Sequence, residues 1–182
     1  ELFKITLPAK YGGIDANATT RAIVIEELAK ICAATSMYIF TTETVILFIK
    51  DYGNEEQKER FFPIFQQKDK IGAFALTEPD FGSNAASIQT RATAEGDFYV
   101  VNGTKAFISS APKANLFLVF ARAGPGEREE GLSTLVIEKD TPGFSCGVPE
   151  KKMGFRSSEL SQLFFEDAKD PQENRLGKEG DG

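Results

Sequence analysis

The sequence predicts an α+β fold, in which an N-terminal helical segment is followed by an antiparallel β-sandwich or barrel domain. Two observations predict it. Apolar residues recur with a helical period before Asp69, and short apolar runs separated by turn residues follow it. Hydrophobic residues make up 41% of the 182 residues, enough for a sizeable core. We expect a helical domain over residues 1–69 and a β-domain over residues 70–182.

The helical part contains three predicted helices. Residues 19–31 separate an apolar stripe from a charged one, and residues 35–51 are apolar nearly all round, which indicates a buried helix. A short third helix is expected near residues 55–62. Asn54 caps its start, and we expect it to end before Pro63.

The part after Asp69 contains short predicted strands. They are expected at residues 71–77, 98–101, 106–108, 116–120, 132–137, 144–148 and 163–165. Asn102-Gly103 is the strongest hairpin signal, because this pair favours a tight type I′ turn. Short strands at this spacing favour an antiparallel sandwich or barrel.

Composition and charge argue against several classes of function. The net charge of −6 argues against a nucleic-acid partner. No apolar run reaches the roughly twenty residues of a membrane span, and the first residues do not read as a signal peptide, so we expect the cytoplasm or an organelle matrix. The chain has no histidine, and Cys32 and Cys146 are far apart, so we expect no metal site and no histidine base.

Two stretches carry candidate binding residues. In residues 76–84 a strand end is followed by proline and glycine, so backbone N–H groups are free to hold an anionic or heteroaromatic ligand. A plain β-turn is the simpler explanation of that stretch. In residues 102–109, period two places Phe107 and Ser109 on one strand face, where a flat cofactor could lie. A Phe107 packed in the core is the simpler alternative there.

Taken together, the motifs resemble those of the acyl-CoA dehydrogenase family. The matching segments are residues 8–13, 53–58, 77–84, 102–109, 141–144, 152–154 and 176–182. The resemblance spans nearly the whole chain, and the chain is identified as a member on these motifs. Asn84 stands where the family commonly has Asp, and Phe107 and Ser109 stand where Trp and Thr are commoner. The family also has further helices at its start and a C-terminal helical bundle, about one domain in size, which this chain lacks.

The resemblance implies FAD as cofactor and an acyl-CoA as substrate. In the family, a base removes the α-proton while the β-hydride passes to flavin N5. The resemblance implies an electron-transferring flavoprotein as acceptor, a homotetramer or dimer, a bacterial or archaeal cytoplasm or the mitochondrial matrix, and a place in fatty-acid β-oxidation. It assigns flavin binding to Phe74, Leu76, Thr77, Ser83, Phe107, Ile108 and Ser109. It assigns acyl-CoA binding to Ser83, Phe40 and Thr44.

The resemblance implies no catalytic residue in this chain. The family's glutamate base belongs to the C-terminal bundle, and no glutamate here matches its motif. We therefore expect a polypeptide ending at Gly182 to expose an apolar patch, to bind FAD weakly and to show no turnover. An acyl-CoA oxidase, a nitroalkane oxidase or a flavin monooxygenase on the same scaffold is one alternative. A non-catalytic protein or fragment is another.

Overall fold

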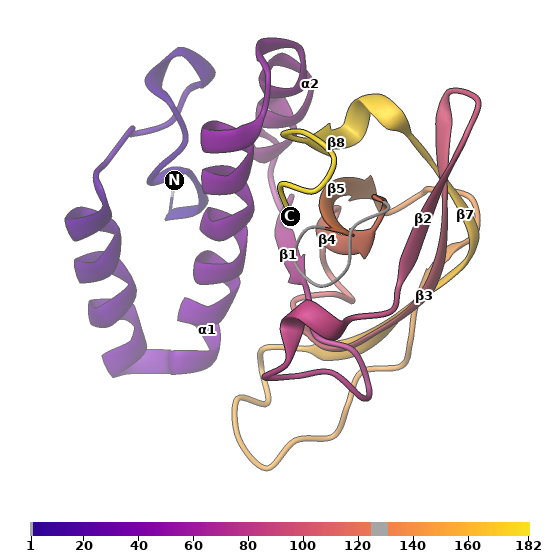
Figure 1. The fold of residues 1–182 in the computed structure, drawn as a ribbon. Helices are drawn as coiled ribbons and strands as arrows, with labels where there is room; N and C mark the ends of the chain where they lie inside the picture. The colour runs from indigo at the N-terminus through magenta and orange to yellow at the C-terminus, as the bar shows by residue number, and fades with distance from the viewer. Residues whose placement is uncertain (1, 125–130) are drawn as a thin grey trace.

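The computed structural model describes residues 2–124 and 131–182 and consists of a helical layer beside a β-sheet layer (Figure 1). The helical layer contains η1 (Leu2–Lys4), η2 (Ala9–Tyr11), α1 (Ala18–Tyr52) and α2 (Glu55–Gln66). The strands are β1 (Gly72–Ala75), β2 (Arg91–Glu95), β3 (Phe98–Ser109), β4 (Leu116–Arg122), β5 (Leu132–Glu138), β6 (Phe144–Cys146), β7 (Leu160–Pro171) and β8 (Arg175–Leu176). Two further 3-10 helices are η3 (Ala85–Ser87) and η5 (Gln172–Asn174). The helix-to-strand change falls between α2 and β1, beside Asp69 as predicted.

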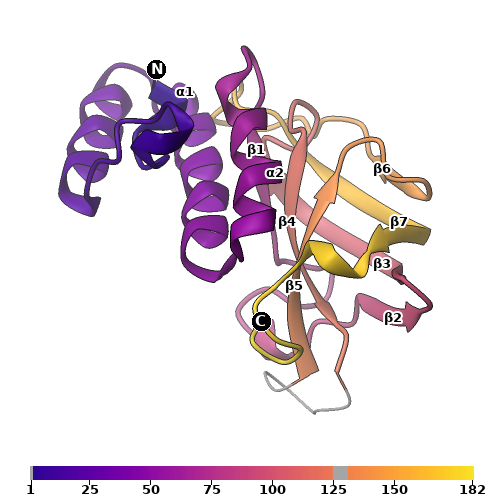
Figure 2. The same cartoon turned by 90° about the horizontal axis from the view of Figure 1, so that it is seen from above.

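Helix α1 breaks at Cys32, where the backbone is not helical (φ −151°, ψ 97°). The two halves lie side by side, and the second half lies nearer the sheet (Figures 1 and 2). The prediction of separate helices at 19–31 and 35–51 is confirmed, although the second helix begins closer to the break than predicted.

The two halves of α1 differ in burial. In the second half, Val45 and Ile49 are fully buried in a core shared with α2 and the sheet. Phe40 on another face is 44% exposed, so the predicted buried helix packs into the core on one side and leaves another side exposed. In the first half, Ile23 is 55% and Ile31 is 89% exposed. These two apolar side chains are therefore not covered by the residues that the structure describes.

By length and composition alone, α1 is apolar enough to cross a membrane, with a mean hydropathy of 1.5 over its most apolar window. Two features are those of a core helix instead. The helix is interrupted at Cys32, and its second half packs against α2 and the sheet.

Helix α2 starts with the predicted capping box. The Asn54 side chain accepts a bond from the Gln57 N–H (2.8 Å), and the Gln57 side chain accepts one from the Asn54 N–H (2.9 Å). The prediction that this helix ends before Pro63 is wrong, because it continues to its last turn at 66. Proline removes one backbone donor. Burial of Phe61 and Phe65, at most 1% exposed, holds the last turn in the core despite that loss.

The described strands form one eight-stranded sheet, with a main path of β6-β7-β3-β2-β4-β5-β8 and with β1 paired to β4. The pairs along the path are antiparallel, except that β2 meets β4 in parallel, as β1 does. The predicted antiparallel β-domain is thus confirmed. The sheet is strongly curved but does not close, so it is not a complete barrel (Figure 2).

The predicted hairpin at Asn102-Gly103 is wrong, because both residues lie inside β3. The turn between β2 and β3 is at Gly96-Asp97 instead. Gly103 has φ +146°, and a Cβ there would lie 2.6 Å from the Thr90 Oγ1 atom. The glycine is needed for this close approach of two chain segments, at a register shift against β7.

Strand β4 is buried on both faces, which explains its unbroken apolar run. Phe117 and Val119 point into the core enclosed by the curved sheet. Leu116 and Leu118 point to the second core, between the sheet and the helices. Alternation along one strand thus divides the hydrophobic core into two parts.

The N-terminal segment is anchored to α1 by a buried carboxylate. Glu43 is 0% exposed and accepts bonds from the N–H groups of Ile5 (2.9 Å) and Thr6 (2.8 Å), and from the Thr6 hydroxyl. The buried charge is compensated by these three donors. Glu43 therefore has a structural explanation that involves no ligand.

Candidate functional site

The two motif stretches predicted from the sequence meet in the structure. The Ala106 N–H donates to the Thr77 carbonyl at 2.8 Å, so the end of the β1 segment is bonded to the last part of β3. Leu76 and Thr77 are both half-buried. Because about thirty residues separate the two stretches, only tertiary structure brings them together.

Phe107 is held out of the core by a β-bulge. Lys105 pairs with Leu163 and Ile108 pairs with Ser161, so two residues of β3 lie opposite one residue of β7. Phe107 has φ +57° and is 66% exposed. The alternative of a core Phe107 is therefore wrong. A non-glycine residue in the left-handed region costs about 1–3 kcal/mol. Because the Phe107 ring is not buried in the core, core packing of this ring does not offset that cost.

The residues after Phe107 join β3 to α1. Ile108 is 2% exposed and belongs to the core inside the sheet, while Ser109 is half-buried. The buried Ser110, at φ +68°, places its Oγ 2.9 Å from the Thr41 Oγ1 of α1. Sequence analysis missed Thr41 and Ser110. The cluster of polar residues at 41–44 inside a predicted buried helix was a signal that could have found Thr41.

A buried ion pair lies behind this junction. The Lys105 ammonium is 2.9 Å from a carboxylate oxygen of Glu78 and donates to the Leu76 carbonyl at 3.1 Å. Burial lowers the pKa of Lys105 to about 8, against the opposing pull of Glu78. Burial also works to raise the pKa of Glu78, but hydrogen bonds from the Gln89 N–H, Lys105 and Thr90 outweigh it and the pKa is lowered.

A turn and an open hollow follow the pair. Glu78 and Phe81 exchange two backbone hydrogen bonds, at 3.0 and 3.2 Å. The hollow beside this turn is about 300 Å³, and the residues that line it include Glu78, Asp80, Phe81, Thr90, Gly103 and Thr104. Ser83 is exposed in the same loop and does not line the hollow. Its assignment to the flavin and acyl-CoA side stays a prediction.

Phe74 lies on the helix-facing side of β1. Its ring centroid is 5.2 Å from that of Phe120 and 5.9 Å from that of Phe48. The ring is half-buried and packs against the core between sheet and helices. This packing explains an aromatic side chain at Phe74 without a ligand, so its flavin role also stays a prediction.

Phe40 and Thr44 contact the first half of α1. The Arg21 guanidinium lies 5.1 Å from the Phe40 ring centroid and donates to the Thr44 Oγ1 at 3.1 Å. One residue further along, Thr41 bonds Ser110 at the end of β3. The helix therefore presents Thr41, rather than Phe40 and Thr44, to the Phe107 segment, and the acyl-pocket assignment of Phe40 and Thr44 is untested.

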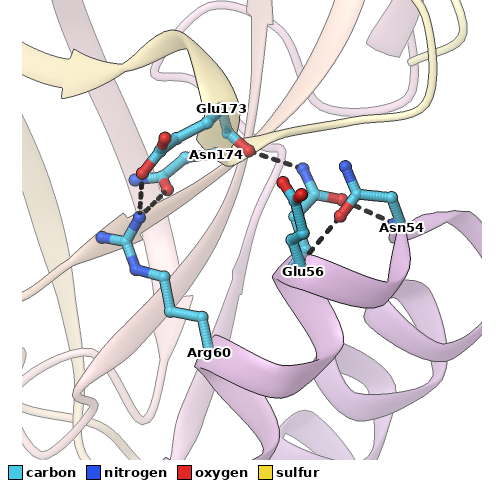
Figure 3. A pocket seen from close by; sticks show the side chains of 6 residues that line it. Asn54, Glu56, Arg60, Glu173 and Asn174 are labelled. Carbon is cyan, nitrogen blue, oxygen red and sulfur yellow. Dashed lines mark hydrogen bonds and ion pairs between the residues drawn. The ribbon is translucent and has the colours of Figure 1, made fainter.

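A second, smaller hollow lies where α2 meets η5 (Figure 3). Arg60 donates to the carboxylates of Glu173 (2.8 Å) and Glu138 (2.7 Å) and to the Asn174 side-chain oxygen (2.9 Å). Gln57 donates to the Glu173 carbonyl at 2.6 Å. The polar groups of this hollow bond one another across the helix–sheet junction, so we interpret it as a structural joint.

Comparison with known proteins places the chain in a family. The profile described as "Acyl-CoA dehydrogenase, middle domain" matches residues 73–168, and the profile described as "Acyl-CoA dehydrogenase, N-terminal domain" matches residues 1–68. The chain belongs to the acyl-CoA dehydrogenase family. The family's N-terminal profile thus covers the helical layer, and its middle profile covers most of the sheet and the whole Thr77–Phe107 junction.

Individual relatives in the acyl-CoA dehydrogenase family agree. An acyl-CoA dehydrogenase of Bacillus subtilis (strain 168) is 39% identical over 185 residues, covering 100% of this chain and 48% of that protein. The structure of butyryl-CoA dehydrogenase from Megasphaera elsdenii has a TM-score of 0.93 at 36% identity, covering 100% of this chain and 49% of that one. An acyl-CoA dehydrogenase of Bacillus anthracis complexed with FAD has a TM-score of 0.88 at 36% identity, with coverages of 100% and 31%. The chain spans about half the length of the curated relatives it matches.

Proposed function

We propose that the whole protein catalyses the FAD-dependent α,β-dehydrogenation of an acyl-CoA thioester, and that this chain supplies part of the flavin and acyl-CoA site. FAD, when bound, supplies the hydride acceptor for this reaction. The observation that carries the proposal is Phe107. A bulge holds this ring out of the core, 66% exposed, next to the strand end that bears Thr77.

The residues at the junction fit a flat heteroaromatic group. The exposed Phe107 ring provides an apolar face for packing. The hydroxyls of Thr77 and Ser109 provide hydrogen-bond donors, and Leu76 adds apolar surface. The Ala106–Thr77 hydrogen bond sets the two segments at a fixed separation.

The chain's own residues would bind and orient the reactants. Phe107 and Leu76 would pack on the ring, and Thr77 would stabilise charge at its polar edge. Phe74 and Ile108 would complete the flavin site, Ser83 would contact the flavin phosphates and the acyl-CoA, and Phe40 and Thr44 would line the acyl pocket. We assign no catalytic base to this chain.

The family also supports proposals about partners and location. We propose acyl-CoA as the substrate, an electron-transferring flavoprotein as the acceptor and a homotetramer or dimer as the assembly. The cytoplasm of a bacterium or archaeon, or the mitochondrial matrix, is the proposed location. Fatty-acid β-oxidation is the proposed metabolic setting.

The test uses the purified whole protein. A visible absorbance spectrum should show bound flavin, and a dye-reduction assay with acyl-CoAs of several chain lengths should show turnover. Oxygen consumption with acyl-CoA and no dye reduction would favour the oxidase alternative. No bound flavin and no turnover with any acyl-CoA would contradict the proposal and favour a non-catalytic protein.

Variants connect the activity to the site. Phe107→Ala should weaken flavin retention about tenfold, because loss of one stacked ring costs about 1–1.5 kcal/mol. Phe98→Ala is the matched control, since Phe98 is a 43% exposed phenylalanine at the other end of the same strand. Thr77→Val should weaken flavin retention or shift the flavin potential, while Thr93→Val on β2 should do neither. Equal flavin retention in all four variants would show that the site is misplaced.

A further inference from the structure

The Lys105 ammonium is a charged group that the proposed function does not yet explain. Its side chain is 0% exposed, and it lies inside β3, two residues before Phe107. Taking an ammonium out of water is unfavourable unless its bonds inside the protein compensate. An apolar residue of similar length would fill the same space without that penalty, so the bonds of Lys105 indicate its role.

Glu78 compensates this charge, and its carboxylate has further hydrogen-bond donors of its own. Besides Lys105, its carboxylate accepts bonds from the N–H groups of Gln89 (2.6 Å) and Thr90 (2.8 Å). These two residues come just before β2. Glu78 therefore closes the segment from the end of the β1 region to the start of β2 into a loop whose two ends are joined through one side chain.

The pair also holds the backbone that carries Thr77. The Lys105 ammonium donates a hydrogen bond to the Leu76 carbonyl at 3.1 Å, and the Ala106 N–H donates one to the Thr77 carbonyl at 2.8 Å. Two successive carbonyls are thus bonded to two successive residues of β3. Phe107 is the next residue of that strand, so the same short segment sets the position of both the Thr77 hydroxyl and the exposed ring.

We propose that Lys105 and Glu78 are positioning residues, which hold the Thr77 strand end against the Phe107 bulge at the separation that the flavin ring requires. This inference rests on the proposed function. It assigns neither residue a contact with the flavin. A neutral, well-packed replacement should therefore keep the fold while the flavin site loses its geometry.

The test compares Lys105→Met with the double variant Glu78→Leu/Lys105→Met in the whole protein. Methionine fills the space of the lysine stem but cannot bond the Leu76 carbonyl. The double variant removes both charges, so no buried charge is left unpaired if the single variant fails to fold. Arg60→Met is the control, because it breaks ion pairs of α2 that lie away from the junction.

Three quantities are measured for each variant: the flavin dissociation constant, the flavin midpoint potential and the unfolding temperature of the flavin-free protein. We expect both Lys105 variants to weaken flavin binding by about tenfold or more and to shift the potential, as loss of the charged hydrogen bonds implies. Arg60→Met should lower only the unfolding temperature. A purely structural role would move the unfolding temperature of the Lys105 variants without moving the potential.

Two results would overturn the inference in different ways. If the wild-type protein binds flavin and a folded Lys105 variant binds it with unchanged affinity and potential, the positioning role is wrong and the proposed function stands. If the wild-type protein binds no flavin, the proposed function fails and this inference fails with it.

Discussion

Ionisation of Asp170 should remove stability from the folded protein as the pH rises toward neutral. Asp170 is 0% exposed in β7. One carboxylate oxygen accepts a bond from the Asn174 amide at 2.8 Å, and the other is buried without a hydrogen-bond partner in the part of the chain that the structure describes. Burial is the main reason that the pKa of Asp170 is raised to about 7, with a smaller contribution from the nearby Glu138, while Asn174 and Arg60 oppose it.

The sign and size of the effect follow from the pKa. An acid whose pKa is raised by folding favours the folded state only in its protonated form, so ionisation destabilises the protein. At 1.36 kcal/mol per pKa unit, the difference between the ordinary value of 3.8 and about 7 corresponds to about 4 kcal/mol. The penalty is absent below pH 3.8, grows through the window from there to about 7, and is constant at higher pH.

The perturbation is Asp170→Asn, which keeps the shape and one acceptor oxygen but cannot ionise. Its stability relative to wild type should rise by about 1.4 kcal/mol per pH unit up to about neutral pH and then level off. Any fixed cost of the new amide shifts this curve without changing its slope. The assay is urea unfolding followed by far-ultraviolet circular dichroism, between about pH 4 and pH 8.

Asp140→Asn is the matched control, since Asp140 is an exposed aspartate. It should change stability equally at every pH. A difference between Asp170→Asn and wild type that does not vary with pH would refute the reasoning. So would a variant that becomes less stable than wild type as the pH rises.

Three further predictions concern local structure. Glu43→Gln replaces one of the two carboxylate oxygens, which accept bonds from the N–H groups of Ile5 and Thr6, by an amide NH₂ that cannot accept. It should destabilise the N-terminal segment by roughly 1–3 kcal/mol. Amide hydrogen exchange should become faster in residues 5–6, with little change elsewhere. Gly143→Ala should cost about 3 kcal/mol in urea unfolding, because φ is +84° and the new Cβ would lie 2.5 Å from the Glu166 carbonyl oxygen, whereas Gly154→Ala should be nearly neutral because its Cβ would meet nothing within 4 Å. Asn54→Ala should cost about 1 kcal/mol through loss of the α2 cap, and an equal stability of variant and wild type would contradict the capping role.

Local features of the fold could be read from the sequence. The change from helical to strand periodicity near Asp69 and the Asn54 capping box both follow from interactions within a few residues, and both are confirmed. The end of α2 could not be read this way. Pro63 is a local signal for termination, but buried aromatic side chains from the same helix outweigh it.

The candidate site was predictable only as two motifs. The position of Thr77 beside Ala106 depends on a hydrogen bond between distant segments, and the exposure of Phe107 depends on a bulge opposite β7. The pairing of Glu78 with Lys105 links the same two segments through side chains. None of these contacts leaves a periodic pattern in the sequence.

Asn102-Gly103 shows the physical reason most directly. This dipeptide predicts a tight turn because glycine and asparagine adopt positive φ at little cost. In the folded chain the same freedom of Gly103 serves a different need, the close approach of Thr90 within a continuous strand. The sequence specifies which backbone conformations a residue tolerates, while the segment that packs against it in the folded protein decides which of them is used.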